Sequence, residues 1–423
     1  MKKPPVVIVG AGSIGLSAAL FLARHDVDVI VLERGPALNL DAASGSAGYV
    51  TPSHCVPLAG PALIRRIPSM VLGRGMISVR PRPDRDLVRF GLQAVRAGRG
   101  ELARAGMRAL LTQARASLGL YAELAAERPE VGFRRNGVMN VCATPKGMEA
   151  LRAEASLLRS EGIEPRILSG AEAAALEPTL RDDVAGAVFW EEDASMNPER
   201  TIVALAELAG AAGAELRLDR SVTGFTRSPE GAITCVHTAA ESLTCSAVVL
   251  AAGAGTSTLG RMLGLRIPVQ PGKGHHVDLP QFEPAPRIPM IFHEHAMGAG
   301  PLGDGIRLTG GMDFAGDDAR VDERRIAAIL RINREYMRDA DRFATAPGGR
   351  PWAGMRPCTP DGLPIVGWLR AAPNTVVATG HGMLGFTLGP AAGRDVADLV
   401  SGGPMDQVRS NWLTQFAPAR YGL

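Results

Sequence analysis

The N-terminal part of the chain alternates between compact apolar runs and short polar breaks. Val6–Val9 is an unbroken run of β-branched residues, which predicts a strand buried on both faces. Helical spacing follows from about Ser13 to Arg24, and the apolar pattern resumes as a second strand over Val27–Glu33. Between the first strand and the helix lies the turn GAGSIG. This order predicts the first βαβ unit of a doubly wound α/β fold.

The same stretch begins with two lysines ahead of an apolar run, as an export signal does. The apolar centre of a signal is an unbroken helix followed by a small-residue cleavage site. Here glycines interrupt the run, and the pattern VDVIVLE continues beyond the expected cut. We therefore interpret the stretch as part of the folded protein.

The glycine turn predicts a dinucleotide site. Gly10 permits a tight turn, Gly12 lets the backbone approach a pyrophosphate, and Gly15 lets the helix pack on the strand. The helix N-terminus offers free N–H groups and a positive dipole end to phosphates. Glu33 closes the second strand, where a carboxylate accepts hydrogen bonds from an adenosine ribose and disfavours a 2′-phosphate. The alternative is a Gly-rich turn in an ordinary buried βα unit.

Two further strand–glycine–helix joints follow much later. Val248–Ala251 predicts a strand, followed by the turn AGAG and a helix over Thr256–Leu263. Val376–Thr379 predicts another strand, followed by glycines 380, 382 and 385 and a helix to Val400. Both ends of the chain are thus expected to build one nucleotide-binding domain, with a second domain inserted in pieces.

The segments between these joints predict a mixture of helices and strands. Apolar residues at helical spacing mark 107–124 and 148–158, and a charged helix is expected from Asp322 to about Arg338. Ser169 with Glu172 reads as a capping box, and Asn197-Pro198 begins a helix to about Ala212. Strands are expected at 137–141, 186–190, 214–218, 275–279 and 306–309.

Composition narrows the class of protein. The chain has 423 residues, 46% of them hydrophobic, and no apolar run long enough to span a bilayer without glycine or charge, so we expect a soluble or at most peripheral protein. A net charge of +3 from 46 basic and 43 acidic residues gives no reason to expect nucleic acid. Five scattered cysteines without a CxxC pair suit reduced thiols in a cytoplasm. His275-His276 and His293-Glu294-His295 invite a metal interpretation, but no ligand set completes either, and we expect no metal.

Five motifs together resemble the FAD-dependent D-amino acid oxidase superfamily. VVIVGAGSIGLSAALFLARHDVDVIVLERG looks like its FAD fingerprint, and VVLAAGAGT is similar to its second FAD motif. GMRPCTPDGLPIVG and TGHGMLGFTLGPAAG resemble its C-terminal flavin-binding and substrate-binding motifs, and ASGSAGYVTPSH resembles its flavin-facing loop. Within the superfamily the likeness is greatest to bacterial D-amino acid dehydrogenases, including those acting on D-proline and hydroxyproline. The helical inserts make up roughly a third of the chain, and they are less diagnostic of the family.

The resemblance implies a fold and a domain division. It is α/β, with a doubly wound, Rossmann-like FAD-binding domain and an inserted α+β substrate domain. Residues 1–60, 194–266 and 348–423 are expected in the FAD-binding domain, and residues 61–193 and 267–347 in the substrate domain.

The resemblance also implies site residues. Arg356 corresponds to the arginine that binds the substrate carboxylate, and a guanidinium fork suits that task; the alternative is a structural arginine bound to loop carbonyls. FAD contacts are implied for Gly10, Gly12, Ser13, Ile14, Gly15, Glu33, Arg34, Ser44, Ala47, Gly48, Val222, Ala252, Gly253, Gly380, Gly382, Met383, Leu384, Gly385 and Thr387. For the small residues, close backbone packing alone is the alternative.

The sequence departs from the family pattern in two places. No tyrosine falls securely at the active-site positions that some relatives use, and Tyr49 and His54 are the nearest candidates. KGHHV replaces a basic-Gly-Gln motif, so Lys273 is expected to keep part of that role while His275 and His276 alter the pocket.

These features predict an FAD-dependent oxidation of an amino acid at its Cα–N bond, with hydride transfer to flavin N5 and formation of an imino acid. The electron acceptor is expected to be a quinone or oxygen. The arginine-rich, apolar stretch ALIRRIPSMVLGRGMISVRPRPDR suits either contact with an anionic membrane surface or an ordinary solvated loop over the pocket.

Four alternatives remain open from the sequence. They are oxidation of a secondary amine or of glycine- and sarcosine-like substrates, a non-catalytic FAD-holding subunit of a larger complex, a flavin hydroxylase, and a nicotinamide-only dehydrogenase. A hydroxylase would carry a GD motif before its last helix, whereas GDDAR at 316–320 lies too early.

Overall fold

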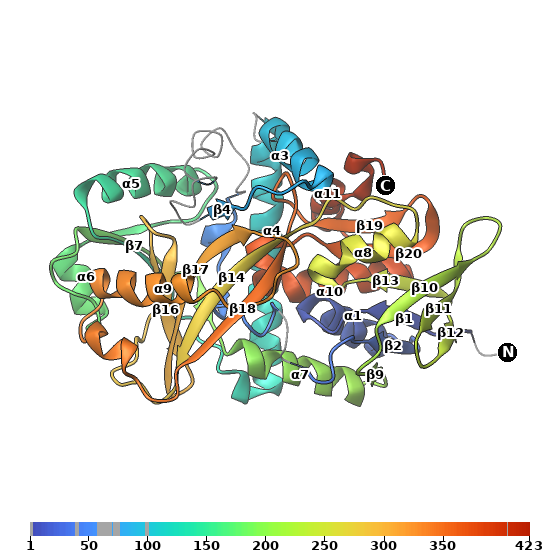
Figure 1. The fold of residues 1–423 in the computed structure, drawn as a ribbon, viewed down its shortest axis with the longest axis horizontal. Coiled ribbons are helices and arrows are strands. Elements are labelled where there is room, and N and C mark those ends of the chain that lie inside the picture. Colours follow the sequence, from blue (N-terminus) through green and yellow to red (C-terminus); the bar gives the residue numbers. More distant parts are fainter. Residues whose placement is uncertain (1–2, 39–41, 57–69, 71–76, 98–100, 404) are drawn as a thin grey trace.

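The computed structural model describes residues 3–38, 42–56, 70, 77–97, 101–403 and 405–423, and it places two sheets side by side (Figure 1). The six-stranded sheet has the order β19-β20-β13-β1-β2-β9. Its strands are β1 (Val6–Val9), β2 (Val29–Leu32), β9 (Glu215–Arg217), β13 (Ala247–Leu250), β19 (Ile365–Leu369) and β20 (Ala372–Thr379). All neighbours are parallel except β19 with β20. The expected α/β fold class is confirmed.

Helices cover one face of the six-stranded sheet because its strands, buried on both sides, need apolar cover there. These helices are α1 (Ser13–Arg24), α4 (Glu101–Glu127), α7 (Pro198–Ala211), α10 (Gly385–Ser401) and α11 (Gln407–Phe416), and they share one apolar cluster. The opposite face is covered by α8 (Thr256–Met262) and a small antiparallel sheet of β10 (Val222–Arg227), β11 (Ile233–Thr238) and β12 (Ser242–Thr244). A sheet therefore stands where a doubly wound domain usually carries helices.

The second sheet has the order β18-β14-β17-β16-β15-β5-β7-β6, with β4 paired to β17. Its strands are β4 (Ile77–Val79), β5 (Val138–Cys142), β6 (Arg166–Ser169), β7 (Gly186–Trp190), β14 (Gln270–Leu279), β15 (Met290–Phe292), β16 (Met297–Leu302), β17 (Gly305–Phe314) and β18 (Arg350–Cys358). Helix α9 (Glu323–Tyr336) packs on one face through an apolar cluster that includes Val277, Leu308 and Ile329. The opposite face looks toward the other half of the molecule.

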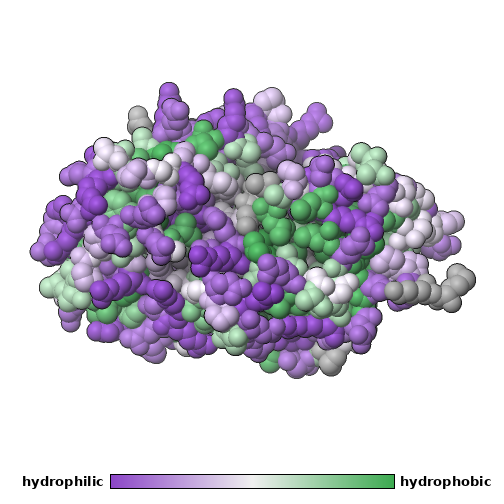
Figure 2. Space-filling view, turned by 90° about the horizontal axis from the view of Figure 1, so that it is seen from below, coloured by the Kyte–Doolittle hydropathy of each residue, from purple (hydrophilic) through white to green (hydrophobic). Residues whose placement is uncertain are grey.

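The remaining elements are short or peripheral. They are β3 (Tyr49–Val50) paired with β8 (Ala194–Ser195), α3 (Arg85–Ala97), α5 (Pro145–Arg159), α6 (Gly170–Leu176) and the 3₁₀ turns 52–54, 129–131, 253–255, 340–344, 382–384 and 418–421. Helix α4 lies between the two halves in Figure 1 and joins their cores. The face seen in Figure 2 is mostly hydrophilic, and its larger apolar area lies toward the half with the six-stranded sheet.

Local sequence signals predicted most of these elements. The capping box of Ser169 and Glu172 is present, Asn197 caps α7, and β7 has the predicted bounds. Strands β14 and β17 extend well beyond the predictions because glycines and a proline inside them obscure the strand pattern. Strand β18 pairs with β14 in the larger sheet, although it lies in a segment expected with the FAD-binding part. The domain boundaries themselves stay a prediction.

No helix of the described part of the chain is long and apolar enough to cross a membrane. The stretch for which we considered membrane contact falls largely on residues 57–69 and 71–76, which lie outside the described residues.

Candidate active site

The first glycine turn combines two packed glycines with one that faces open space. Gly10 has a φ of +110°, and a Cβ there would lie 2.6 Å from the Ala251 carbonyl oxygen. A Cβ on Gly15 would lie 2.0 Å from the Gly10 oxygen, whereas one on Gly12 would meet nothing within 4 Å. Helix α1 begins here without a side-chain cap, so its first N–H groups have no capping side chain. This is the arrangement that a pyrophosphate requires.

Glu33 ends β2 beside this turn. Its Oε2 accepts a hydrogen bond from the Ala11 N–H at 2.9 Å, and its Oε1 accepts one from the Gly35 N–H at 2.9 Å. These bonds fix the carboxylate at the mouth of the turn, where the sequence predicts a ribose. Arg34 is exposed, and Val222 on β10 packs at the edge of the cluster that holds Ile30 and Ala252. Their contacts with a cofactor stay predictions.

The second and third glycine turns lie beside the first because β1, β13 and β20 are adjacent parallel strands. Their carboxyl ends meet at one edge of the sheet, the usual place for a nucleotide. The Thr379 hydroxyl donates to the Gly253 carbonyl at 2.9 Å, and the Ser13 hydroxyl donates to the Gly385 carbonyl at 2.9 Å. All three turns are thus fastened to one another.

The third turn holds an orphaned polar side chain. His381 is 3% exposed, and neither ring nitrogen has a partner among the described residues. Burial lowers the pKa of its imidazole to about 3. Gly253 and Gly382 both have a φ of +53° with nothing within 4 Å of an added Cβ. Met383 and Leu384 lie in the 3₁₀ turn that precedes α10, and Thr387 lies in the first turn of α10, which also begins without a side-chain cap.

The loop Ser44–Gly48 connects these turns to the larger sheet. Gly48 has a φ of +75°, and a Cβ there would lie 2.2 Å from the Met196 carbonyl oxygen. The Thr387 hydroxyl donates to the Tyr49 carbonyl at 3.1 Å and accepts from the Thr51 N–H at 3.3 Å. The loop, including Ala47, is therefore held next to the N-terminus of α10, as the flavin-facing role implies.

Arg356 lies on β18 with only part of its donor capacity used. Its Nη1 donates to the Gly311 carbonyl at 2.8 Å, and its Nε and Nη2 donate to no described residue. Burial lowers the pKa of its guanidinium. A Cβ on Gly274 would lie 2.3 Å from Arg356 Cζ, so the glycine of KGHHV makes room for the guanidinium. The free N–H groups suit a carboxylate.

The strand register decides which side chains share a face with Arg356. His276 pairs with both Trp352 and Thr309, and Gly298 pairs with Thr309, so these residues lie on the face opposite α9. Lys273 and His275 face α9 instead: Lys273 Nζ donates to the Arg320 carbonyl at 3.0 Å, and His275 Nε2 accepts from the Asp322 N–H at 3.3 Å. Of the KGHHV side chains, only His276 therefore faces the site.

Tyr49 and His54 lie farther along the same face. The Tyr49 ring packs over Gly300, its hydroxyl donates to the Met290 carbonyl at 3.3 Å, and burial raises the pKa of the phenol. His54 Nδ1 lies 2.7 Å from Ser53 Oγ, which is also hydrogen-bonded to Asp193. Burial lowers the pKa of His54 to about 4, although Asn140 acts in the opposite direction.

Sheet order separates these residues from Arg356. Asn140, beside His54, is on β5, and strands β15, β16, β17 and β14 lie between β5 and β18. At about 4.8 Å per strand, the backbones of Asn140 and Arg356 are on the order of 20 Å apart. The structure therefore brings Arg356 together with Gly274, Trp352 and the glycine turns, and it does not bring His54 to them.

Two residues of this region were missed by the sequence analysis. Arg307 is 2% exposed and bonds to the Ser44 and Ser46 carbonyls and to Asp278, and Trp352 stacks on His276 with ring centroids 4.7 Å apart. Arginine is so common in this chain that nothing in the sequence distinguishes Arg307. The WAG preceding Met355 and Arg356 was a visible signal for Trp352.

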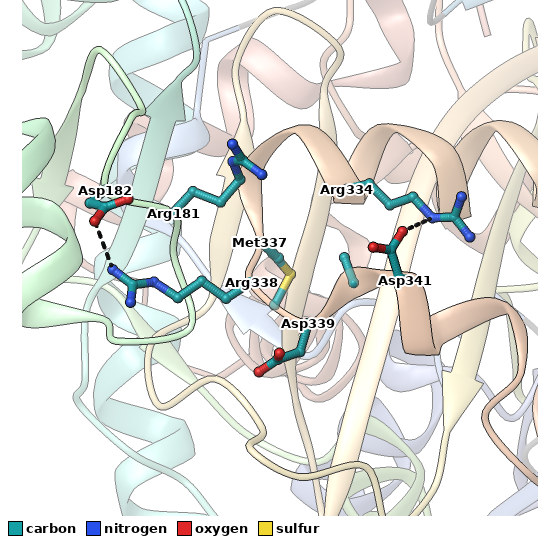
Figure 3. Close-up of a pocket in the computed structure, with 8 residues that line it drawn as sticks. Arg181, Asp182, Arg334, Met337, Arg338, Asp339 and Asp341 are labelled. Carbon is teal, nitrogen blue, oxygen red and sulfur yellow. Dashed lines mark ion pairs between the residues drawn. The ribbon is translucent and has the colours of Figure 1, made fainter.

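A separate surface pocket of about 300 Å³ lies at the end of α9 (Figure 3). Its arginines are matched by carboxylates: Arg334 lies 3.5 Å from Asp341 and Arg338 3.6 Å from Asp182, and Arg181 pairs with Asp183. Three arginines and three aspartates line the pocket, so its formal charges balance. Within the described ranges no three His, Cys, Asp or Glu side chains gather as a metal site.

Comparisons with known proteins identify the class. A family model described as "FAD dependent oxidoreductase" matches residues 5–399, so the chain belongs to that family. It is 31% identical to a D-amino acid dehydrogenase of Paramagnetospirillum magneticum, over 94% of this chain and 95% of that protein. It is 30% identical to a D-amino acid dehydrogenase of Cereibacter sphaeroides, over 94% and 92%.

Solved structures agree in fold. Glycine oxidase from Geobacillus kaustophilus matches with a TM-score of 0.75 at 24% identity, covering 96% of each chain. L-Proline dehydrogenase from P. horikoshii matches with a TM-score of 0.70 at 19% identity, covering 98% of this chain and 97% of that one. The cofactor is FAD, and the residues present fit it: three open glycine turns, uncapped N-termini of α1 and α10, and the orphaned His381.

Proposed function

We propose that the protein is a D-amino acid dehydrogenase that oxidises the Cα–N bond of its substrate to an imino acid. The observation that carries the proposal is Arg356, a partly buried arginine whose Nε and Nη2 groups donate to no described residue. The curated relatives named D-amino acid dehydrogenases, similar over nearly their whole length, support the same substrate class.

Arg356 orients the substrate in this proposal. Two parallel N–H groups bind both carboxylate oxygens, which fixes the plane of the carboxylate and the direction of the Cα–H bond. The bond from Nη1 to the Gly311 carbonyl holds the guanidinium while its other N–H groups bind the ligand. Gly274 keeps space above the guanidinium, because any side chain there would collide with it.

FAD, when bound, supplies the hydride acceptor at N5. The uncapped N-terminus of α10, beginning at Gly385, directs N–H groups and a positive dipole end toward the ring edge where negative charge gathers. Proton loss from the substrate amine needs no strong protein base and passes to solvent. The Tyr49 hydroxyl already donates to a backbone carbonyl, and burial keeps the His54 imidazole neutral, so we assign neither a proton-transfer step.

We propose a quinone rather than oxygen as the electron acceptor, because the curated relatives are named dehydrogenases. Contact with a membrane surface and association with a partner subunit belong to the same proposal. Both are tested by whether the purified chain alone turns over with a soluble quinone.

The test is anaerobic absorbance of the purified protein against enantiomer pairs of alanine and proline, hydroxyproline isomers, glycine and sarcosine. We expect the oxidised flavin spectrum to bleach with D-enantiomers and not with L-enantiomers. Bleaching by glycine or sarcosine alone would indicate instead that the enzyme oxidises glycine-like substrates. A flavin that no amine bleaches would refute the proposal and favour a non-catalytic FAD-holding subunit.

Readmission of air distinguishes oxygen from a quinone as the electron acceptor. Slow recovery of the oxidised spectrum in air, with fast recovery on adding a soluble quinone, is the expected result. Recovery in air as fast as with the quinone would contradict the dehydrogenase assignment and define an oxidase.

A further inference from the structure

Three successive carbonyls of the flavin-facing loop are bound from the larger sheet. Arg307 Nη1 donates to the Ser44 oxygen at 3.0 Å and to the Ser46 oxygen at 2.6 Å. His276 Nδ1 lies 3.1 Å from the Gly45 oxygen between them. The loop therefore turns its carbonyl side toward β14 and β17. The Ala47 N–H, in contrast, has no hydrogen-bond partner among the described residues.

Every donor of Arg307 is used. Its Nε donates to Asp278 Oδ1 at 2.7 Å, and its Nη2 donates to Asp278 Oδ2 at 2.8 Å and to Glu199 Oε1 at 3.0 Å. Burial would raise the pKa of the Asp278 carboxyl, but hydrogen bonds from Arg307 and His276 outweigh it and hold the pKa well below its usual range. Glu199 is on α7, so one side chain connects the loop, the larger sheet and a helix of the other half.

A stacked pair of rings, Trp352 on His276, packs against the same loop. Trp352 lies over His276 with an angle of 11° between the rings. A Cβ on Gly45 would lie 2.1 Å from Trp352 Cη2, and one on Gly354 would lie 2.0 Å from it. The two glycines, on the loop and on β18, therefore leave the space that the indole fills. Neither the loop nor the sheet shifts freely while this ring is in place.

We propose that Arg307, acting with Asp278 and His276, is a positioning residue that presets the flavin-facing loop before the cofactor binds. A buried arginine with all five N–H donors satisfied by fixed partners cannot adapt to several loop conformations. A loop held in its bound shape loses less conformational entropy when the ligand arrives, and this raises affinity. The proposal concerns FAD alone and is independent of the amino acid substrate.

The test uses the two ends of the cofactor separately. ADP carries only the part of FAD that the first glycine turn is expected to bind, whereas FAD also carries the ring that is expected to face Ser44–Gly48. In the Arg307→Lys variant of the full chain, freed of cofactor, we expect FAD affinity to fall about tenfold, as loss of a fork of charged hydrogen bonds implies. ADP affinity is expected to remain within about twofold of wild type, because the lost contacts lie away from the pyrophosphate turn.

Arg325→Lys is the matched control. Arg325 also pairs with a buried carboxylate, Asp313, but it lies against the α9 face of the same sheet. The Arg325→Lys substitution is expected to leave the affinities for FAD and for ADP unchanged. Amide hydrogen exchange of 44–48 in the cofactor-free protein is a second readout, and it should speed up in Arg307→Lys only.

Three results would overturn the proposal. They are wild-type FAD affinity in Arg307→Lys, equal losses of FAD and ADP affinity, or the same losses in Arg325→Lys. Because no substrate is added, these results are distinct from failure of the amino acid assignment, which appears only in the bleaching experiment.

Discussion

At the residue scale, Arg356 is the group whose chemistry is most constrained. One donor is committed to Gly311, and the guanidinium makes no other hydrogen bond to the described residues. A lysine at this position provides a charge but no planar pair of donors. We expect Arg356→Lys to lower kcat/KM about a hundredfold, mainly through KM, with an unchanged flavin spectrum. Steady-state kinetics with the best substrate of the panel checks this, and Arg24→Lys on the surface is the control.

A substitution at Gly274 tests the same site by changing its shape rather than its charge. An alanine Cβ would lie 2.3 Å from Arg356 Cζ, so the guanidinium has to move. We expect Gly274→Ala to raise KM about tenfold while FAD content stays normal, because the collision affects the substrate site alone. Gly119→Ala, where an added Cβ meets nothing within 4 Å, serves as control. An unchanged KM in Gly274→Ala would contradict the assigned role of Arg356.

Asp193 gives a pH-dependent stability. Burial raises the pKa of its carboxyl to about 8, against the lowering effect of hydrogen bonds from Ser53. The folded protein therefore holds a proton that the unfolded chain has lost above a pKa of 3.8, and the free energy of unfolding falls as pH rises toward 8. The buried histidines have the opposite effect around and below pH 6.5, because burial lowers the pKa of each; they are His54, His275, His276 and His381.

The difference between wild type and Asp193→Asn isolates Asp193, because the histidines contribute equally to both proteins. Between pH 6.5 and pH 8 we expect the wild-type free energy of unfolding to fall by about 1.5 kcal/mol relative to that of the variant. Urea denaturation of the FAD-saturated protein at several pH values measures both slopes. Equal slopes in the two proteins would show that Asp193 is ionised in the folded state.

At the element scale, the sequence predicted elements whose signals are local. The β1–α1–β2 unit, the capped helices α6 and α7 and the strands before the three glycine turns follow from patterns within a few residues. Strand β14 was predicted only in its second half, because QPGKG carries none of the β-branched residues that mark strands. The pairing of β18 with β14 joins segments far apart in the chain, and no local pattern records such a pairing.

Helix α11 shows how a terminal element is fixed. Asp395 on α10 is fully buried and accepts hydrogen bonds from Gln113, Trp412 and Arg409. Removing the arginine would leave a buried carboxylate without its counter-charge. We expect Arg409→Met to lower the free energy of unfolding by about 3–5 kcal/mol. Arg24→Met, which breaks an exposed pair with Glu127, should cost no more than about 1 kcal/mol.

Chemical denaturation of the FAD-saturated protein compares these two variants. A loss in Arg409→Met as small as that in Arg24→Met would mean that the C-terminal helix adds little to global stability. The activity of the folded fraction is expected to be unchanged, because Arg409 lies away from the glycine turns and β18.

At the scale of the whole molecule, the three glycine turns that fit FAD come from both ends and the middle of the chain. The sequence predicted the three glycine turns and Arg356 because each lies in a compact motif. It did not predict Arg307, whose partners Ser44, Asp278 and Glu199 lie far apart in sequence and meet only after the two sheets pack. Side chains that connect separate segments carry no spacing signal, so positioning residues are harder to predict than binding motifs.

The two halves nevertheless share one core. The cluster that contains Ile8 and Val31 of the smaller sheet also contains Val188 and Trp190 of the larger one, joined through α4. We therefore expect a single cooperative unfolding transition even without cofactor, with coincident midpoints by far-UV circular dichroism and by tryptophan fluorescence. FAD at about a thousand times its dissociation constant should add about 4 kcal/mol and raise that one midpoint. Two separate transitions in the cofactor-free protein, merging only when FAD is added, would mean that the cofactor rather than the shared core couples the halves.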